Sequence, residues 1–510
     1  MRPGTVALES RLLDRPDVVR HRGRVAIAIT DITPHEALVE DLLFIRQVLD
    51  DAGIKYLLVR GNDERPVIAI DRIQRRRLRD ALVEACRNEP FYSKTVDGKG
   101  KARLVADGKL ATSGKARIFR LFRPRVVVAS GLSYGASSGV QIELWVFDGD
   151  TIELPAENSL TRRTMRSDEA ERGSVERFGQ SWPTIVNMFA DHASDISFDI
   201  DLVFSWVDGS SPEYRAARAA RAAGHVVGEG DDSEARYRQI DELKYALRSI
   251  HMYAPWIRRI FVATDSERPE WLADDPRVTF VRSEEFFADP SVLPTHNSHA
   301  VECQLHHIPD LAEHFIYSND DMFFGRAVSP QMFFSPGGIT MFIEAGLRIG
   351  LGHSDEERSG YENGARVNRR LLFERFGTLT TRHLEHAPTP LRRSVMQELE
   401  ETFPDAFAAT AASTFRASDN ISVTNSLYHY YALMTGRAVA QTAAKVAYVN
   451  STSLAGFREM DTLLEKRSTD FFCLNDSSFP EVDLDERKEF VTDFLERYYP
   501  LRAPWEAPGT

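Results

Sequence analysis

The sequence has few cysteines and no long apolar run. Only three cysteines occur among 510 residues, and Cys86, Cys303 and Cys473 are far apart and form no CxxC pair. A disulfide framework and a structural zinc site are therefore not expected. The low cysteine content instead indicates a reducing compartment. No stretch reaches the roughly 18 apolar residues that span a bilayer, and charges interrupt the N-terminal segment, so no signal peptide is expected. We expect a cytoplasmic protein without a transmembrane segment. This expectation is compatible with peripheral association at the inner face of the membrane.

The chain also lacks an excess of basic residues. Lysine and arginine total 63 against 76 acidic residues, which gives a net charge of -13. Nucleic-acid binding usually needs a basic surface, so no nucleic-acid partner is expected, although a local basic pocket for a phosphorylated small molecule is not excluded. The length of 510 residues predicts two or three domains.

The pattern of apolar residues divides the chain into three regions. Residues 1–190 alternate helix-like and strand-like segments, which predicts an α+β accessory domain, and no catalytic signature is evident there. Residues 195–345 alternate strands and helices, which predicts an α/β core with a largely parallel sheet. Residues 346–510 are predicted to form a mainly helical region that covers the sheet from one side. Low complexity and internal repeats are not evident.

Acidic residues follow three of the predicted core strands. Asp208 ends the run FDIDLVFSWVD, Asp265 follows FVAT, and Asp320 and Asp321 follow HFIYSN. Ligands of open α/β sheets bind beyond the carboxyl ends of the strands. A single acidic residue at such a place is usually a turn former or a helix cap. Two adjacent carboxylates between apolar runs instead indicate Mg²⁺ or Mn²⁺, which binds one or two carboxylates together with substrate phosphates.

The helical region supplies complementary groups. His386 lies in the loop LEHAPTP, Arg416 precedes an Asp-Asn pair, and Asn475 and Asp476 follow another apolar run. They offer a base with an ordinary pKa of about 6.5, a clamp for anions and neutral donors. These residues together indicate an enzyme that handles phosphate groups.

Four segments resemble the signatures of the Stealth family of sugar-phosphate transferases, which includes bacterial capsule hexose-1-phosphate transferases and the animal N-acetylglucosamine-1-phosphate transferase. The segments occur in the family's order and extend from about residue 200 to about residue 476. Their sequences are IDLVFSWVDGSSP, the long run RYRQIDELKYALRSIHMYAPWIRRIFVATD to HFIYSNDDMFFG, EHAPTPLRRSVM with FRASDNISVTNSLYHYYALMTGRAV, and FFCLND.

The resemblance implies a nucleotide-sugar-transferase-like fold and a reaction. Such enzymes move a sugar-1-phosphate from a nucleotide sugar, commonly UDP-linked, to a hydroxyl of an acceptor saccharide. A phosphodiester forms, the nucleoside monophosphate leaves, and the anomeric bond is never broken. Catalysis of phosphoryl transfer consists mostly of positioning and charge neutralisation, which the predicted groups can supply.

The resemblance also assigns roles to residues. Asp320 and Asp321 match the family's paired aspartates at the catalytic centre and would hold the Mg²⁺ or Mn²⁺. His386 is the preferred general base, Arg416 would hold the diphosphate, and Asn475 would contact phosphate or metal. Residues expected to border or bind the donor are Asp201, Trp206, Asp208, Gly209, Arg236, Arg238, Lys244, Arg248 and Asn297, with His296 and Ser298 as further candidates and Glu242 as a structural partner.

Several alternatives stay open at this point. A conventional metal-dependent glycosyltransferase would release the nucleoside diphosphate, and a sugar-binding scaffold would have lost the aspartate pair or His386. The sequence does not show which aspartate binds the metal, or whether His386 or an aspartate takes the proton. Residues expected to pack rather than react are Trp256, Trp271, the helix-face pair His306 and His307, and Tyr428, Tyr430 and Tyr431.

Overall fold

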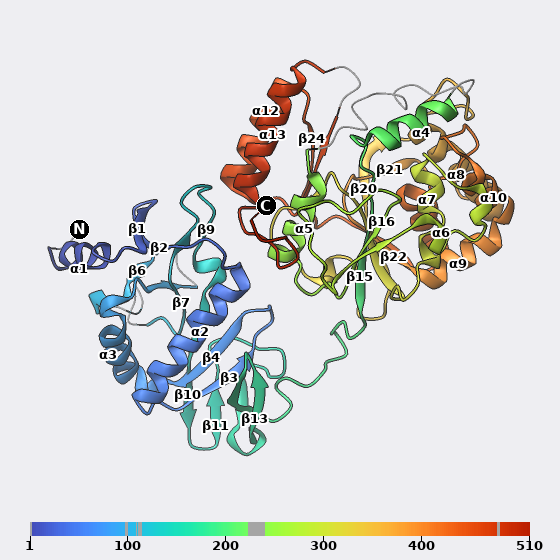
Figure 1. Cartoon of the computed structure of the whole chain (residues 1–510). Helices are drawn as coiled ribbons and strands as arrows, with labels where there is room; N and C mark the ends of the chain where they lie inside the picture. Colours follow the sequence, from blue (N-terminus) through green and yellow to red (C-terminus); the bar gives the residue numbers. More distant parts are fainter. Residues whose placement is uncertain are drawn as a thin grey trace. The chain divides into compact units, whose positions relative to one another are not determined.

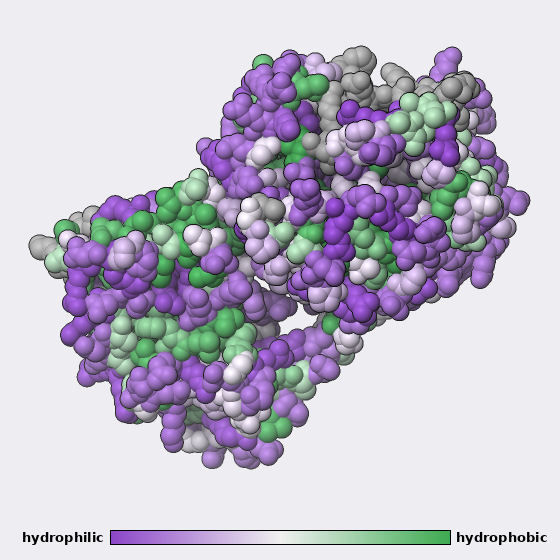
Figure 2. Space-filling view, viewed as in Figure 1, coloured by the Kyte–Doolittle hydropathy of each residue, from purple (hydrophilic) through white to green (hydrophobic). Residues whose placement is uncertain are grey.

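The computed structural model describes residues 3–96, 100–108, 110, 115–222, 240–476 and 480–509. The chain divides into two compact units, Met1–His192 and Ala193–Thr510 (Figure 1). No helix of the described residues is long and apolar enough to cross a membrane. Figure 2 shows a face covered mostly by hydrophilic residues, with apolar residues confined to smaller areas.

The first unit has the predicted α+β composition. Strand β10 pairs with β4 in parallel and with β7 antiparallel, at the centre of an eight-stranded sheet. Helix α2 begins with a capping box formed by Thr33 and Glu36. The elements are α1 Pro3–Leu13, β1 Val18–His21, β2 Arg24–Ala28, α2 Pro34–Asp51, β3 Tyr56–Arg60, β4 Pro66–Asp71, α3 Arg75–Ala85, β5 Tyr92–Thr95, β6 Arg103–Leu104, β7 Ile118–Phe122, β8 Arg125–Val126, β9 Ser133–Tyr134, β10 Val140–Asp148, β11 Thr151–Glu153, β12 Thr164–Arg166, β13 Arg172–Arg177 and β14 Gln180–Ile185.

The second unit is built on a five-stranded sheet in the order β17-β16-β15-β18-β22. Three neighbouring pairs are parallel and only β22, at one edge, is antiparallel. The predicted α/β fold with a largely parallel sheet is therefore confirmed. The elements are β15 Ile200–Ser205, α4 Pro212–Ala222, α5 Glu242–Tyr253, β16 Ile260–Ala263, β17 Val278–Val281, α6 Ser283–Phe286, α7 Ser298–Glu302, the 3₁₀ turn η8 Leu305–His307, β18 His314–Asn319, β19 Met322–Phe324, β20 Thr340–Arg348, α8 Gly360–Phe376, β21 Arg382–Leu384, β22 Thr389–Arg392, α9 Arg393–Thr402, α10 Pro404–Ala412, the π-helical turn η10 Val423–Leu427, α11 Tyr428–Met434, β23 Ala438–Gln441, β24 Val446–Asn450, α12 Leu454–Lys466, β25 Phe471–Asn475 and α13 Leu484–Tyr498.

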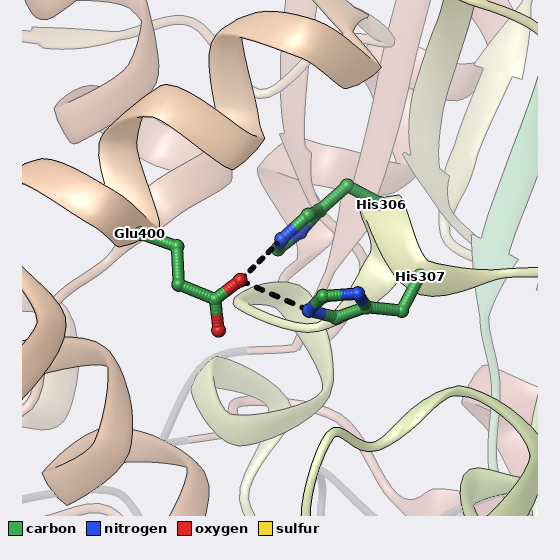
Figure 3. A group of neighbouring side chains, drawn as sticks. All are labelled: His306, His307 and Glu400. Atoms are coloured by element: carbon green, nitrogen blue, oxygen red, sulfur yellow. Dashed lines mark hydrogen bonds and ion pairs between the residues drawn. The ribbon is translucent and has the colours of Figure 1, made fainter.

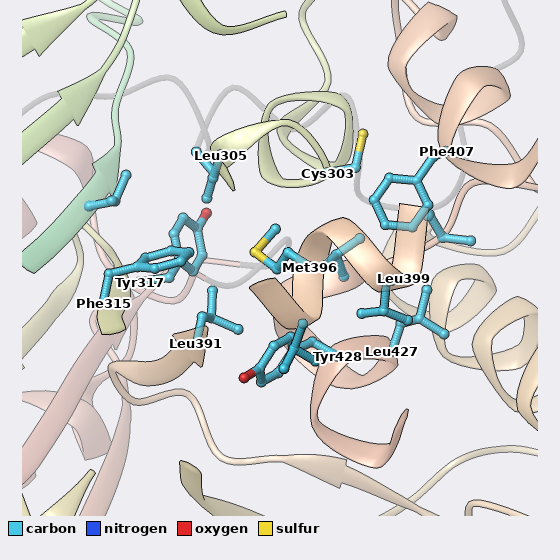
Figure 4. Packing of buried hydrophobic residues seen from close by; sticks show 14 of the residues in the cluster. Cys303, Leu305, Phe315, Tyr317, Leu391, Met396, Leu399, Phe407, Leu427 and Tyr428 are labelled. Atoms are coloured by element: carbon cyan, nitrogen blue, oxygen red, sulfur yellow. The ribbon is translucent and has the colours of Figure 1, made fainter. Parts of the chain in front are cut away.

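Helices from the third region pack on one face of this sheet, as predicted. Alternate strand residues such as Phe315 and Tyr317 belong to one hydrophobic core with Met396 and Leu399 of α9 and with Leu427, the last residue of η10 (Figure 4). This pattern follows from the strand period, which directs every second side chain to the same face. The aromatic residues Tyr428, Tyr430 and Tyr431 are buried in or beside this core, which agrees with a packing role.

Two details differ from the helical pattern. Two helices, α9 and α10, follow one another directly in the sequence, because Pro404 cannot continue α9 and begins α10 instead. The region after residue 346 also contributes the strands β21 to β25. Of these, β25 pairs antiparallel with β19, the strand that follows the aspartate pair.

Candidate active site

A cleft of about 1450 Å³ opens at the carboxyl ends of the parallel strands of the second unit. Strand β15 leads into Trp206 and Asp208, β16 into Asp265, and β18 into Asp320 and Asp321, and all five residues line the cleft. Because the carboxyl ends of parallel strands lie at one edge, the sheet brings these separate motifs together. Asn475, the last residue of β25, and Asp476, which follows it, line the same cleft.

The pairing of β19 with β25 places the fourth motif beside the aspartate pair. Met322 lies opposite Cys473, and the backbone N–H of Leu474 donates to the carbonyl of Asp321 at 3.0 Å. The thiol of Cys473 lies 3.4 Å from the Asp321 carboxylate. Asp321 and Cys473 are 152 residues apart in the sequence. The register of the β19–β25 pairing brings them into contact.

The aspartate pair lies in strongly negative surroundings. Burial raises the pKa of Asp320 well above its usual range, and the nearby Glu242 and Asp321 carboxylates raise it further. Burial also raises the pKa of Glu242 to about 7, although the backbone N–H of Ile240 donates to its carboxylate. Negative charge accumulated in this way favours a bound cation.

The donor set fits a hard divalent cation. Asp320, Asp321, Asn475 and Asp476 offer only oxygen ligands, which Mg²⁺ and Mn²⁺ prefer. Within the described ranges, these carboxylates do not form a group of three with ligand atoms within 4.8 Å of one another. Phosphate and water oxygens would therefore complete the coordination, as is common for Mg²⁺.

Arg487 of α13 is the nearest basic residue to these acids that sequence reasoning missed. Its guanidinium forms an ion pair with Asp476, donates to Ser451 Oγ at 3.1 Å and lies 3.9 Å from Glu242. It lines the cleft from the side of β25. No motif marks this arginine in the sequence, because its partners come from three other segments.

His386 lies in the cleft between two aromatic rings. Its ring centroid lies 5.9 Å from that of Tyr361 and 5.0 Å from that of Tyr448. Burial lowers the pKa of His386, so the imidazole is neutral at pH 7 and can accept a proton. Both tyrosines line the cleft and were not predicted as site residues.

Arg416 enters the cleft from the loop before η10. Its Nη2 donates to Ser298 Oγ at 2.8 Å. Asn297 holds this loop, because its amide donates to the carbonyls of Ser413 and Phe415 at 3.2 and 3.3 Å. Asn297 thus lines the cleft but positions Arg416 rather than offering free donors to a substrate.

Two further residues of this wall line the cleft. His296 lies between the rings of Tyr214 and Phe415, and burial lowers its pKa to about 4, with a further contribution from neighbouring arginines. Glu302 was not predicted; it is buried and accepts from Thr424 Oγ1 at 2.6 Å. Burial raises the pKa of Glu302, so it can carry a proton there.

Asp208 shapes the loop after β15. Its carboxylate accepts from the backbone N–H and the hydroxyl of Ser210 at 2.9 and 2.5 Å, which is the pattern of an Asx turn. Gly209 follows, and its carbonyl accepts from Arg215 at 2.9 Å. Trp206 is buried, with its ring 6.2 Å from Phe280.

Asp201 is not a cleft residue. It lies near the amino end of β15, opposite the cleft edge of the sheet, and is fully buried. Arg258 donates to both of its oxygens at 2.8 and 2.6 Å, and the backbone N–H of Ala312 donates at 2.8 Å. This corrects the predicted donor-binding role, because the carboxylate is fully engaged in holding two loops together.

Arg248 and Lys244 of α5 do not line the cleft either. Arg248 is buried, and its guanidinium donates to both oxygens of Glu506 at 2.7 and 2.8 Å and to the Tyr499 carbonyl at 3.0 Å. The predicted substrate-binding role of Arg248 is thus replaced by a structural one that ties α5 to residues 499–506. Arg236 and Arg238 lie outside the described residues.

This correction predicts a stability effect. Glu506→Gln leaves the buried Arg248 without its bidentate partner, and we expect unfolding to become easier by about 3 kcal/mol. The urea midpoint of the full chain measures this loss. Asp274→Asn is the matched control, since Asp274 is 98% exposed beside Arg268 and should change stability by less than about 1 kcal/mol. If Glu506→Gln instead keeps the urea midpoint of the wild type and binds the nucleotide sugar more weakly, Arg248 has the substrate-binding role after all.

Comparisons with known proteins identify the family of this chain. Models of the four Stealth protein conserved regions match residues 198–226 (region 1), 236–342 (region 2), 385–433 (region 3) and 461–510 (region 4). Exopolysaccharide phosphotransferase CpsY of Mycobacterium tuberculosis strain H37Rv is 57% identical over 96% of this chain and 92% of its own length. The exopolysaccharide phosphotransferase of Nocardia farcinica is 54% identical over 92% of this chain and 88% of its own.

The fold and the cleft are those of an α/β transferase. The chain belongs to the Stealth family and is an enzyme. A solved galactosyltransferase, LgtC, in complex with donor and acceptor sugar analogs, also matches, over 61% of this chain and 98% of that one. Its identity of 12% and TM-score of 0.31 are too low to transfer a donor or a reaction.

Proposed function

We propose that this enzyme transfers a sugar-1-phosphate from a nucleotide sugar to a hydroxyl of an acceptor saccharide in exopolysaccharide or capsule synthesis. The donor would be a UDP-linked hexose or N-acetylhexosamine such as UDP-GlcNAc, and the nucleoside monophosphate would leave. One observation carries the proposal: the aspartate pair, His386 and Arg416 come from separate elements and line a single cleft. The names of the phosphotransferase relatives support the same chemistry.

The residues divide the reaction between them. Neutral His386 accepts the proton of the acceptor hydroxyl, whose oxygen attacks the phosphorus next to the sugar. Arg416, whose guanidinium donates to Ser298, would bind the diphosphate as a cation. Asp320 and Asp321, with Asn475, would hold Mg²⁺ or Mn²⁺, which neutralises charge on the phosphate oxygens. The phosphorus–oxygen bond to the nucleoside monophosphate breaks, and the anomeric bond stays intact.

The aromatic rings beside His386 indicate where the acceptor would enter. Tyr448 is 49% exposed and its ring lies edge-on to His386, and the Tyr361 ring is tilted by 42° to the same imidazole. Aromatic faces of this kind pack against the apolar faces of sugar rings. An acceptor sugar lying there would present a hydroxyl to the imidazole.

The released nucleotide tests the proposal. We expect incubation of the full chain with a series of UDP-sugars, Mg²⁺ and acceptor oligosaccharides to release UMP and form a phosphodiester. Phosphorus NMR and anion-exchange chromatography separate UMP from UDP and detect the phosphodiester. Release of UDP with a new glycosidic bond would overturn the proposal in favour of a conventional glycosyltransferase.

A further inference from the structure

A group of metal-ligand side chains lies outside the cleft. His306 and His307 end the turn η8, and Glu400 lies in α9 (Figure 3). In the part of the chain that the structure describes, this is the only group of three His, Cys, Asp or Glu side chains whose ligand atoms all lie within 4.8 Å of one another. None of the three lines the cleft.

The two imidazoles point at the same atom. Nε2 of His306 lies 2.8 Å and Nε2 of His307 lies 3.0 Å from Oε2 of Glu400 (Figure 3). Ligand atoms around a tetrahedral Zn²⁺ lie about 3.3–3.5 Å apart, because the Zn–N and Zn–O bonds are about 2.0–2.2 Å long. The observed distances of 2.8 and 3.0 Å therefore need to open by about 0.3–0.7 Å to admit the ion.

The ligands are held on a rigid base and face solvent on one side. His306 is fully buried, and its carbonyl accepts from Arg393 Nε at 2.8 Å. The neighbouring Leu305 and Leu399 belong to the core beneath the sheet-covering helices. His307 and Glu400 are 31% and 28% exposed, which leaves an entry path for an ion and room for a water molecule.

Nδ1 of the buried His306 ring has no hydrogen-bond partner among the described residues. A Zn²⁺ ion bound at Nε2 would replace the Nε2···Oε2 hydrogen bond to Glu400 and leave the ring proton on Nδ1.

We propose that His306, His307 and Glu400 bind a Zn²⁺ ion, with water as the fourth ligand. Two nitrogens and one carboxylate oxygen form a set that Zn²⁺ prefers, whereas the oxygen-only set of the cleft suits Mg²⁺. The ion would join η8 to α9 and stabilise the folded second unit. Cysteine spacing gives no sign of this site, since all of its ligands are histidine and glutamate. The helix predicted at the histidine pair is a single 3₁₀ turn, Leu305–His307.

Zinc binding to the full chain tests the proposal. The background is an Asp320→Asn, Asp321→Asn double variant, so that the cleft does not contribute ligands. After removal of metals with a chelator and dialysis, we expect equilibrium dialysis with elemental analysis to find one equivalent of Zn²⁺ per chain at micromolar zinc. Zn²⁺, but not Mg²⁺, should raise the melting temperature by several degrees, and Co²⁺ should give the visible spectrum of a four-coordinate site.

Single substitutions in the same background assign the ligands. His307→Ala and Glu400→Gln should each remove the bound equivalent and the thermal shift, while His353→Ala, an exposed histidine outside the group, should change neither. Melting of each variant without zinc shows whether it folds. Failure of the folded background variant to bind zinc, or a full equivalent retained by folded His307→Ala, would overturn the site. Neither result depends on the transferase reaction.

Discussion

Asp321→Asn is expected to lower kcat/KM by at least about 1000-fold while the enzyme stays folded. The substitution keeps the shape of the side chain but removes one of the two charges that would hold the divalent cation against the diphosphate. It also leaves the backbone contact between Asp321 and Leu474 in place, so the β19–β25 register should survive. The fall in kcat/KM would thus result from the missing charge and not from a change in the fold.

Turnover measured with and without metal checks this prediction. For the wild-type enzyme, a chelator should abolish release of the nucleotide and excess Mg²⁺ should restore it, whereas the variant should stay inactive at any Mg²⁺ concentration tested. Asp461→Asn, an exposed aspartate on α12, is the matched control and should keep full activity. Retention of more than about a tenth of the wild-type rate would contradict a central role. The same series with Asp320→Asn shows whether the second carboxylate is equally required for turnover.

His386→Ala is expected to lower kcat by about 10²–10⁴-fold, the range of a general base. The reason is that the acceptor hydroxyl would lose its proton acceptor, while donor binding through Arg416 remains. We therefore expect a nearly unchanged dissociation constant for the nucleotide sugar, measured by calorimetry with Mg²⁺ present. His353→Ala provides the control for loss of an exposed imidazole. An equal fall in donor affinity and rate would show that His386 binds the donor instead.

The pH profile gives a second test of the same residue. Burial lowers the pKa of His386, so its neutral form persists below the ordinary value of about 6.5, and loss of the base begins only at lower pH. Glu242 titrates at about 7 in the same cleft and can add its own step. In Glu242→Gln, the acid limb of kcat/KM should lie below pH 6.5. Burial also raises the pKa of Asp320, so the same profile is measured in Glu242→Gln with His386→Ala added. An acid limb that is unchanged by loss of the imidazole would exclude His386 as its source.

Much of the site could be predicted because its signals are local. The strand ends carrying Asp208, Asp265 and the aspartate pair follow directly from apolar runs, and parallel pairing gathers them at one edge. The motifs with His386 and Arg416 lie in loops, where a polar residue between apolar segments is easily seen. Such residues need no knowledge of distant partners.

The errors concern charged residues whose partners are distant in the sequence. Asp201 and Arg248 look the same in the sequence whether they bind substrate or an opposite charge, and Arg248 meets Glu506 258 residues later. The same distance hid Arg487, which reaches the cleft from α13. In the folded protein, the buried side chains of Asp201 and Arg248 form ion pairs instead of binding a substrate, and only the tertiary structure shows these partners.

The β19–β25 pairing also sets the order in which the enzyme becomes competent during synthesis. The aspartate pair is translated about 150 residues before Cys473 and Asn475, so the cleft lacks one wall until β25 and then α13 have left the ribosome. Until then β19 lacks its partner strand and exposes Met322 and Phe323, which are buried in the folded protein. An exposed strand edge with apolar side chains promotes aggregation. A chain arrested before residue 470 would therefore be both inactive and prone to misassembly. Activity at this cleft therefore requires that β25 has been synthesised and has paired with β19.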